Sequence, residues 1–239
     1  AVQRSGTSAN GGSGSLRIGS GSLGAQALSL DTSRSLTVDP DAQFAARQIA
    51  ANGSAIRFVA DGVDTSGLDG LVLGSATLAQ FAASETLSLI SRDDIRFIGD
   101  VSLALGDTAL SLSAARYVGD GGAVNIDTNR LSLGGSAAAT SATVATELGS
   151  LDLNASELAF GDGFARFDGF QTIRASIDDR AIATGSSQFD FGAADVALST
   201  PLLTANTGSD LRLSTTGALR LDSAAATAAP RRGSAGSSP

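Results

Sequence analysis

The chain repeats a short pattern, here called an apolar doublet, in which two apolar residues flank one other residue. Because side chains alternate between the two faces of a β-strand, both apolar residues of a doublet face the same side. Gly, Ser, Asp or Asn residues separate the doublets, so the pattern predicts a series of short strands with one buried face. The doublets lie at 28–30, 36–38, 71–73, 87–89, 95–97, 103–105, 110–112, 124–126, 131–133, 151–153, 158–160, 189–191, 196–198, 211–213 and 219–221.

Neighbouring doublets often begin seven or eight residues apart, as at 28 and 36 or at 103 and 110. This spacing leaves only four or five residues for a corner, which suits a chain that winds around a narrow core. Barrels and sandwiches usually have longer strands, with turn signals every 8–12 residues or so. We therefore expect an all-β fold, a single-stranded parallel β-helix (β-solenoid). With roughly 20–30 residues per coil, it would have about 8–10 coils and a length of some 40 Å.

Composition restricts the β-solenoid to the central part of the chain. The two ends are rich in Gly, Ser and Ala and have too little apolar surface to offset the entropy of ordering. We expect a flexible segment over 1–15, a β-solenoid over 16–222 and a flexible tail over 223–239. Residues 134–146 are mostly Ala, Ser and Thr, and they fit a rung of small side chains, a loop or a short helix. Because the chain does not begin with Met and has no signal pattern, we interpret it as a mature product or an excised piece.

The residue types that are missing exclude several kinds of chemistry. The 239 residues include no Cys, His or Trp, and all 16 basic residues are Arg. Without His there is no Ser-His-Asp triad and no imidazole zinc site, and without Lys there is no Schiff base or standard P-loop. The net charge of −8 disfavours nucleic acid as a partner. No run approaches the roughly 20 consecutive apolar residues of a membrane helix, so we expect no membrane insertion.

Acidic residues are strongly biased towards Asp, since only three of the 24 acidic residues are Glu. Asp stabilises turns by hydrogen bonds from its side chain to the backbone, whereas Glu favours helices. The bias therefore places Asp at the corners of the coils. The Phe residues at 160, 164, 167 and 170 occupy apolar positions of the pattern, and we expect them in the core because aromatic side chains bury a large area.

Two runs carry a resemblance to a known family. The run 202–221, LLTANTGSDLRLSTTGALRL, and the run 26–38, QALSLDTSRSLTV, resemble the rungs of filamentous haemagglutinin-type exoproteins. The segment 151–198 is similar in style to the downstream shaft of such proteins. These are large bacterial surface adhesins, right-handed parallel β-helices exported by two-partner secretion. The resemblance covers roughly 16–222 and implies a right-handed helix, a secreted or cell-surface location and no catalytic residue.

Two glycine-rich runs formally match ligand-binding motifs. Residues 19–24, GSGSLG, fit the dinucleotide fingerprint G-x-G-x-x-G, which functions only between a strand and a helix N-terminus. The residues that follow alternate as a strand does, so we predict a turn. Residues 119–127, GDGGAVNID, contain one imperfect copy of a calcium-binding β-roll repeat. Calcium requires six to eight oxygen ligands and hence tandem copies, so we predict a turn here too.

Two pairs of adjacent carboxylates are the remaining candidates for catalysis. Asp93 and Asp94 lie near Arg92 and Arg96, and Asp178 and Asp179 lie near Arg174 and Arg180. Some β-helical lyases combine Asp clusters with calcium and a basic residue, and inverting glycosidases use two carboxylates about 6.5–9.5 Å apart. Both pairs also fit polar corners between apolar runs, and structural ion pairs often imitate a site. We favour the structural interpretation.

The Thr residues at 140, 143 and 146 suggest an ice-binding face, but three residues at a period of three form no array across several coils. We expect an ordinary surface there.

We therefore predict a structural, non-enzymatic segment of a secreted bacterial surface protein that acts as an adhesin shaft or contact surface, with no cofactor and no metal. Its expected partner is a protein or glycan on a host or neighbouring cell. Exposed strand edges at the end rungs also allow self-association. The alternatives are therefore a self-assembling subunit of an extracellular filament or biofilm matrix, and a calcium-assisted polysaccharide lyase or hydrolase that uses Asp93, Asp94, Asp178 and Asp179.

Overall fold

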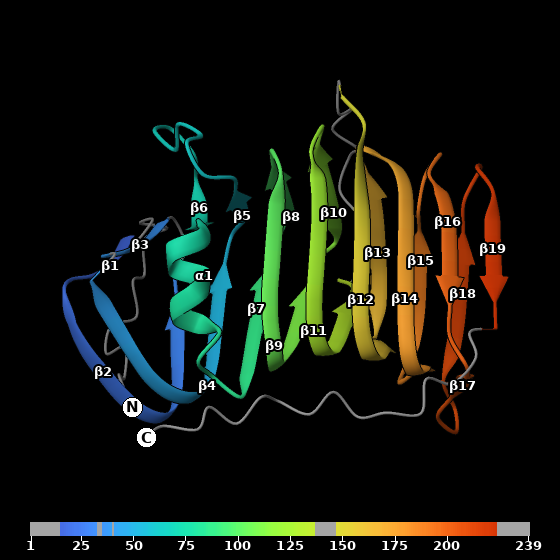
Figure 1. Ribbon diagram of the computed structural model, residues 1–239, viewed down its shortest axis with the longest axis horizontal. Coiled ribbons are helices and arrows are strands. Elements are labelled where there is room, and N and C mark those ends of the chain that lie inside the picture. Colours follow the sequence, from blue (N-terminus) through green and yellow to red (C-terminus); the bar gives the residue numbers. More distant parts are fainter. Residues whose placement is uncertain (1–14, 33–34, 40, 137–146, 224–239) are drawn as a thin grey trace, which may run out of the picture.

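The computed structural model describes residues 15–32, 35–39, 41–136 and 147–223. The chain winds into a β-solenoid of about 8 turns, in which strands of successive coils pair in parallel (Figure 1). The predicted fold class is confirmed. Ser15 pairs with Ser35 and Val196 pairs with Leu219, so one coil takes 20 to 23 residues there, as expected. The expected flexible segments lie almost entirely outside the described residues, as do Thr140, Thr143 and Thr146.

Two parallel sheets, sheet A and sheet B, enclose the core. Sheet A has the order β1 (Ser15–Ile18), β3 (Ser35–Val38), β6 (Gly70–Leu73), β5 (Ile56–Val59), β8 (Asp94–Ile98), β10 (Arg116–Asp120), β13 (Gly163–Asp168), β15 (Ser186–Asp190) and β18 (Asp210–Ser214). Sheet B has the order β19 (Leu219–Asp222), β16 (Asp195–Ser199), β14 (Phe170–Ala183), β12 (Gly149–Phe160), β11 (Ala123–Gly134), β9 (Val101–Ser113), β7 (Thr86–Ser91), β4 (Ala42–Gly53) and β2 (Gly21–Asp31). The short strand β17 (Leu203–Ala205) pairs with β14.

The long strands of sheet B bend in the middle and so cover two sides of the solenoid. In β9 the residues alternate between buried and exposed except at Gly106 and Asp107, which are both exposed. Doublets seven residues apart would face opposite sides of a straight strand, and this extra outward residue returns both to the core. The predicted corners between 103 and 110, 124 and 131, and 151 and 158 lie where expected, but no loop separates two short strands there. Each is a bend within one continuous strand.

Apolar side chains stack in columns along the inside of the coils. Leu103, Ile126, Leu153, Ala175 and Leu198 follow one another in register, and all are buried. Burial of one Leu or Ile contributes about 1.5–3 kcal/mol relative to exposure, so every coil adds a similar increment. Repetition of this contact therefore holds the coils together.

Aromatic rings fill the core next to sheet A. Phe58 stacks on Phe97 with 5.1 Å between ring centroids, and Tyr117 stacks on Phe167 at 4.7 Å. Of the four Phe residues expected in the core, Phe160, Phe167 and Phe170 are buried, and Phe164 is half-buried. The Tyr117 hydroxyl donates to the carbonyl oxygens of Leu112 at 2.9 Å and Gly134 at 2.8 Å.

A helix takes the place of half a strand in sheet B. The helix α1 (Ser75–Phe81) lies between β4 and β9 and buries Leu78 and Phe81. It occupies the place that the first half of a long strand takes in the other coils, and β7 supplies only the second half (Figure 1). The strand before the helix, β6, lies in sheet A between β3 and β5 and pairs in parallel with both.

The strand β6 is an additional strand of sheet A, and farther along the described part of this sheet has one strand fewer. After Ser136 the described chain resumes at Glu147, and β10 pairs directly with β13. Within the described residues, sheet A therefore gains β6 in one place and has no strand between β10 and β13 in another. From β2 and β3 to β14 and β15 each sheet has seven strands, so the two sheets stay in step.

Several Asp side chains lie at corners, as predicted. Asp39 and Asp190 accept hydrogen bonds from backbone N–H groups two residues later. Asp100, Asp162 and Asp195 instead accept from the backbone of the following coil, at Ala123, Ser186 and Ala218. A corner Asp therefore also ties one coil to the next.

Candidate functional site

The densest group of charges lies on the outer side of sheet A around Asp94. The side chain of Asp94 is only 3% exposed, and three arginines from successive strands surround it. Arg57 Nη1 lies 2.6 Å from Asp94 Oδ1, Arg96 Nε lies 3.6 Å from Oδ2, and Arg116 Nη2 lies 3.9 Å from Oδ2. We call these four residues the Asp94 cluster.

The strand register explains why the Asp94 cluster forms. Arg57 pairs in register with Arg96, and Arg116 pairs with Asp94. These positions alternate with inward-facing apolar residues, so the charged side chains all point outward. Three coils thus place their arginines around one carboxylate.

A second group of ion pairs continues along sheet A. Arg166 Nε donates to Asp168 Oδ1 at 2.8 Å, and Arg166 Nη1 lies 3.7 Å from Asp190 Oδ2. The hydrogen bond to Asp168 raises the pKa of Arg166 above its ordinary value, and the charges of Asp168 and Asp190 add to the effect. Arg116 and Arg166 are in register on neighbouring strands, so this group adjoins the Asp94 cluster.

The charges of the two groups balance. Arg57, Arg96, Arg116 and Arg166 face the carboxylates of Asp69, Asp94, Asp168 and Asp190. A buried charge is tolerated when it is paired, and removal of one partner from such a pair is strongly destabilising. The arrangement therefore fits ties between coils better than capture of an anion.

Asp93 and Asp94, predicted as a polar corner, have different environments. Asp93 is exposed at the corner, and the neighbouring Arg92 lies 3.7 Å from Asp31 across the coils. Asp94, in contrast, is the first residue of β8 and is buried, so the prediction of a polar corner is wrong for this residue. The physical reason is that Arg57 and Arg116 come beside it from other coils.

Asp178 and Asp179 lie where the sequence places them, at a bend. Both are exposed in the middle of β14, where its alternation is interrupted. Nearby, Arg180 Nη2 forms an ion pair with Glu157 at 2.6 Å, and Arg174 Nη1 lies 3.7 Å from Asp152. These contacts join β14 to β12 in the preceding coil.

The two Asp pairs do not come together. Asp94 belongs to sheet A in the coil of β7 and β8, whereas Asp178 and Asp179 belong to sheet B four coils later. Four coil spacings amount to about 19 Å, well beyond the separation of the two carboxylates in a glycosidase. The pairs therefore cannot form one dicarboxylate site.

A repeated sequence signal for the Asp94 cluster was missed. The tripeptide Ile-Arg-Phe occurs at 56–58 and at 95–97, and the two copies pair exactly in register. Repetition of Arg at an outward position of the same sheet indicates a charged column. Arg116 is not the middle residue of a doublet and carries no such signal.

Each glycine-rich run contains a turn, as predicted, but the other residues of both runs lie in strands. Residues 19–20 connect β1 to the strand β2, so no helix follows the G-x-G-x-x-G match. Gly121 and Gly122 connect β10 to β11, and Gly121 has a φ of 81°, which favours glycine. Among the described residues, no group of three or more acidic side chains is arranged to hold a metal ion.

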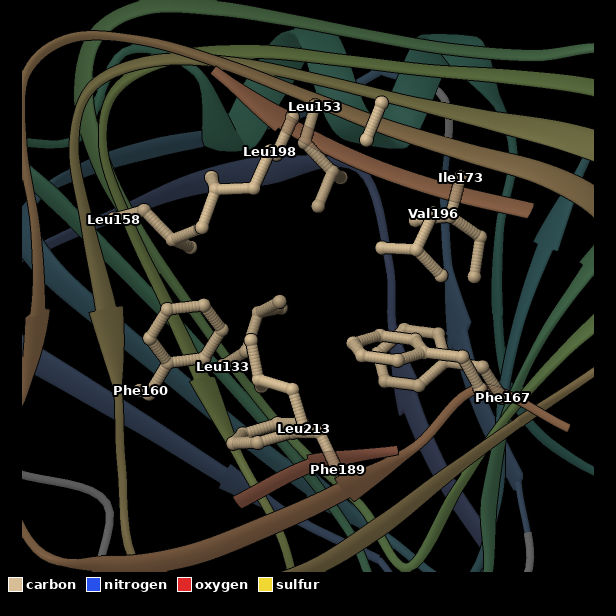
Figure 2. A pocket seen from close by; sticks show the side chains of 13 residues that line it. Leu133, Leu153, Leu158, Phe160, Phe167, Ile173, Phe189, Val196, Leu198 and Leu213 are labelled. Atoms are coloured by element: carbon tan, nitrogen blue, oxygen red, sulfur yellow. The ribbon is translucent and has the colours of Figure 1, made fainter. Parts of the chain in front are cut away.

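A small apolar cavity lies inside the coils nearest the C-terminal end. Its volume is about 30 Å³, and its lining includes Leu153, Phe160, Phe189 and Leu198 (Figure 2). Ligand sites usually measure about 300–1,000 Å³. We therefore interpret this cavity as a packing defect of the core.

No known protein family, curated protein or solved structure matches the chain. Across the described part of the chain, helices are too short or too polar to cross a lipid bilayer.

Proposed function

We propose that the chain is a non-enzymatic, structural segment of a secreted bacterial surface protein, in which the β-solenoid acts as the shaft of an adhesin or as a contact surface. The observation that carries this proposal is the coil-on-coil stacking, with in-register strands from β2 to β19 and a continuous apolar core from β2 to β16. Each coil satisfies the backbone groups of its neighbours, so length and stiffness come from repetition. The resemblance of the rungs to filamentous haemagglutinin-type exoproteins supports the same role.

The charged side chains support the role of a shaft because they connect successive coils. The ion pairs of sheet A and the pair between Glu157 and Arg180 connect successive coils. The hydrogen bonds of Asp100, Asp162 and Asp195 do the same at corners. Side-chain ties between coils resist the peeling of one coil from the next, which a shaft requires.

Surface labelling and an activity assay test the proposal. In the bacterium that encodes the chain, an antibody against it should label intact cells, and labelling only after permeabilisation would contradict a surface location. The purified chain should bind host cells or glycans without releasing new sugar ends from acidic polysaccharides. Release that is lost in Asp94→Asn or in Asp178→Asn, although that variant remains folded, would favour the lyase or hydrolase instead.

A further inference from the structure

The C-terminal end of the described stack leaves core side chains partly exposed. Leu219 and Leu221 of β19 lie in register on Val196 and Leu198, which are buried. Leu219 and Leu221 are nevertheless 44% and 55% exposed, because β19 is the last strand of sheet B within the described residues. This end therefore presents the apolar interior of a coil.

The N-terminal end has a corresponding apolar surface. Leu16 and Ile18 of β1 and Leu23 of β2 pack against the core but are only partly buried. Phe44, the in-register neighbour of Leu23 in the next coil, is buried. Each end also has unpaired strand edges. The outer edges of β1 and β2 at this end, and of β18 and β19 at the other end, carry N–H and C=O groups that lack a strand partner among the described residues.

The two ends are complementary in strand direction. Strand pairs of both sheets are parallel throughout the described residues. A second copy whose N-terminal end meets the C-terminal end of the first would therefore continue both sheets, with β1 beside β18 and β2 beside β19. Apolar side chains would meet apolar side chains, as they do between neighbouring coils within one molecule.

We propose that copies of this chain associate head to tail through these ends, which goes beyond the role of a shaft. The interface repeats the coil-on-coil contact that already holds the molecule together. Because the two surfaces differ, the contact is heterologous and leaves one free end of each kind. Association therefore continues into an open-ended filament as the concentration rises.

Two end variants of the 239-residue chain test the proposal. The C-end variant carries Leu219→Asp and Leu221→Asp, and the N-end variant carries Leu16→Asp and Ile18→Asp. The matched control is Ile90→Asp, since Ile90 is 44% exposed like Leu219 but lies on the outer side of β7, away from both ends. Sedimentation velocity over a concentration series measures the mean mass, and negative-stain electron microscopy measures the length of the rods.

We expect the wild type and the control to grow in mass with concentration, as rods of constant width. Each end variant alone should need at least a tenfold higher concentration to associate, as expected from the loss of buried Leu or Ile contacts. A mixture of the two variants should form dimers and stop there, because each supplies the one intact end that the other needs.

Other outcomes overturn the proposal. A wild type that remains monomeric at every concentration would overturn head-to-tail association. If the monomers are rods, the shaft proposal still stands. End variants that assemble like the control also overturn head-to-tail association. An N-end variant that dimerises alone would show pairing between two C-terminal ends. Circular dichroism verifies that the variants fold. If an Asp double variant does not fold, a milder Ala double variant replaces it: Leu219→Ala with Leu221→Ala at the C-terminal end, or Leu16→Ala with Ile18→Ala at the N-terminal end.

Discussion

Sheet A around β10 and the adjacent part of sheet B differ on their outer sides. In β10 the residues from Arg116 to Gly119 are all buried, whereas β9 and β11 alternate between buried and exposed residues. An outward position therefore means solvent on sheet B but not at this part of sheet A. The same residue type can consequently have very different energetic roles on the two sheets.

The two Asp pairs show what this difference means. Asp94 is buried among three arginines on sheet A, and Asp178 and Asp179 are exposed at a bend of sheet B. Desolvation strengthens the interaction between opposite charges and also makes an unpaired charge costly. The comparison predicts that substitutions on sheet A are costly and that equivalent substitutions at the bends of sheet B are not.

The largest effect should come from Asp94→Asn. This change removes the shared partner of Arg57, Arg96 and Arg116, and loss of one partner of a buried ion pair costs about 3–5 kcal/mol. The free energy of unfolding, measured by urea denaturation, should fall accordingly. The matched control is Glu85→Gln, whose ion pair with Arg47 is solvent-exposed, with 63% of the Arg47 and 61% of the Glu85 side chain accessible, and the expected cost is about 1 kcal/mol or less. Equal losses in the two variants would contradict the comparison.

The second-largest effect tests the inner side of sheet A. Phe97 and Gly119 are in register, and the ring of Phe170 occupies the space that a side chain at 119 would need. A Cβ at Gly119 would lie 2.6 Å from Phe170 Cε1. Gly119→Ala should therefore destabilise the protein by about 1–3 kcal/mol, the usual cost of overpacking a core.

The control for this substitution is Gly24→Ala in β2. A Cβ there meets no atom within 4 Å, so the free energy of unfolding should change by about 0.5 kcal/mol or less. A loss at Gly24 as large as that at Gly119 would show that glycine matters to the strands in general. Packing against Phe170 would then not be the cause.

The doublets correctly predict the solenoid because every coil must supply inward apolar residues at a period of two. They miss β4 and β14, in which Ala or Gly occupies several inward positions. They also do not show that the strand continues through a bend, since a sequence spacing of seven fits a turn as well as a bulge. The helix α1 has only seven residues, too few for a helical period to stand out.

The Asp94 cluster could be predicted only in part. The two Ile-Arg-Phe tripeptides mark a column of arginines, but the pairing of Arg116 with Asp94 depends on the register between β8 and β10. The order in which β6 enters sheet A also has no local signal. Such features depend on contacts between coils, which one stretch of sequence does not contain.

A smaller effect should appear at Tyr117, on the inner side of β10. Tyr117→Phe removes a buried hydroxyl that donates to Leu112 and Gly134, which should cost about 1 kcal/mol. Burial also raises the pKa of Tyr117 above its ordinary value. Below pH ~10 the phenol is neutral in both states, and above it only the unfolded state ionises, so stability falls as the pH rises.

The composition makes this pH dependence specific. The chain has one Tyr and no Lys, Cys or His, so no other side chain titrates between about pH 8 and 11. Urea denaturation of the wild type should show a decline across the upper part of this range, and the Tyr117→Phe variant should show none. An identical decline in both would assign it to another cause.

The smallest effect should come from the exposed pair on sheet B. Asp178→Asn with Asp179→Asn changes two solvent-exposed carboxylates at the bend of β14, so the free energy of unfolding should shift by about 0.5 kcal/mol or less. Because these residues lie four coils from Asp94, they share no ligand with it, and we expect the melting temperature to be the same in calcium and in chelator. A ligand that binds only the folded state raises the melting temperature, so a calcium-dependent rise that this variant abolishes would reveal a metal site at the bend. It would also reverse the comparison, because the functional carboxylates would then be the exposed pair of sheet B.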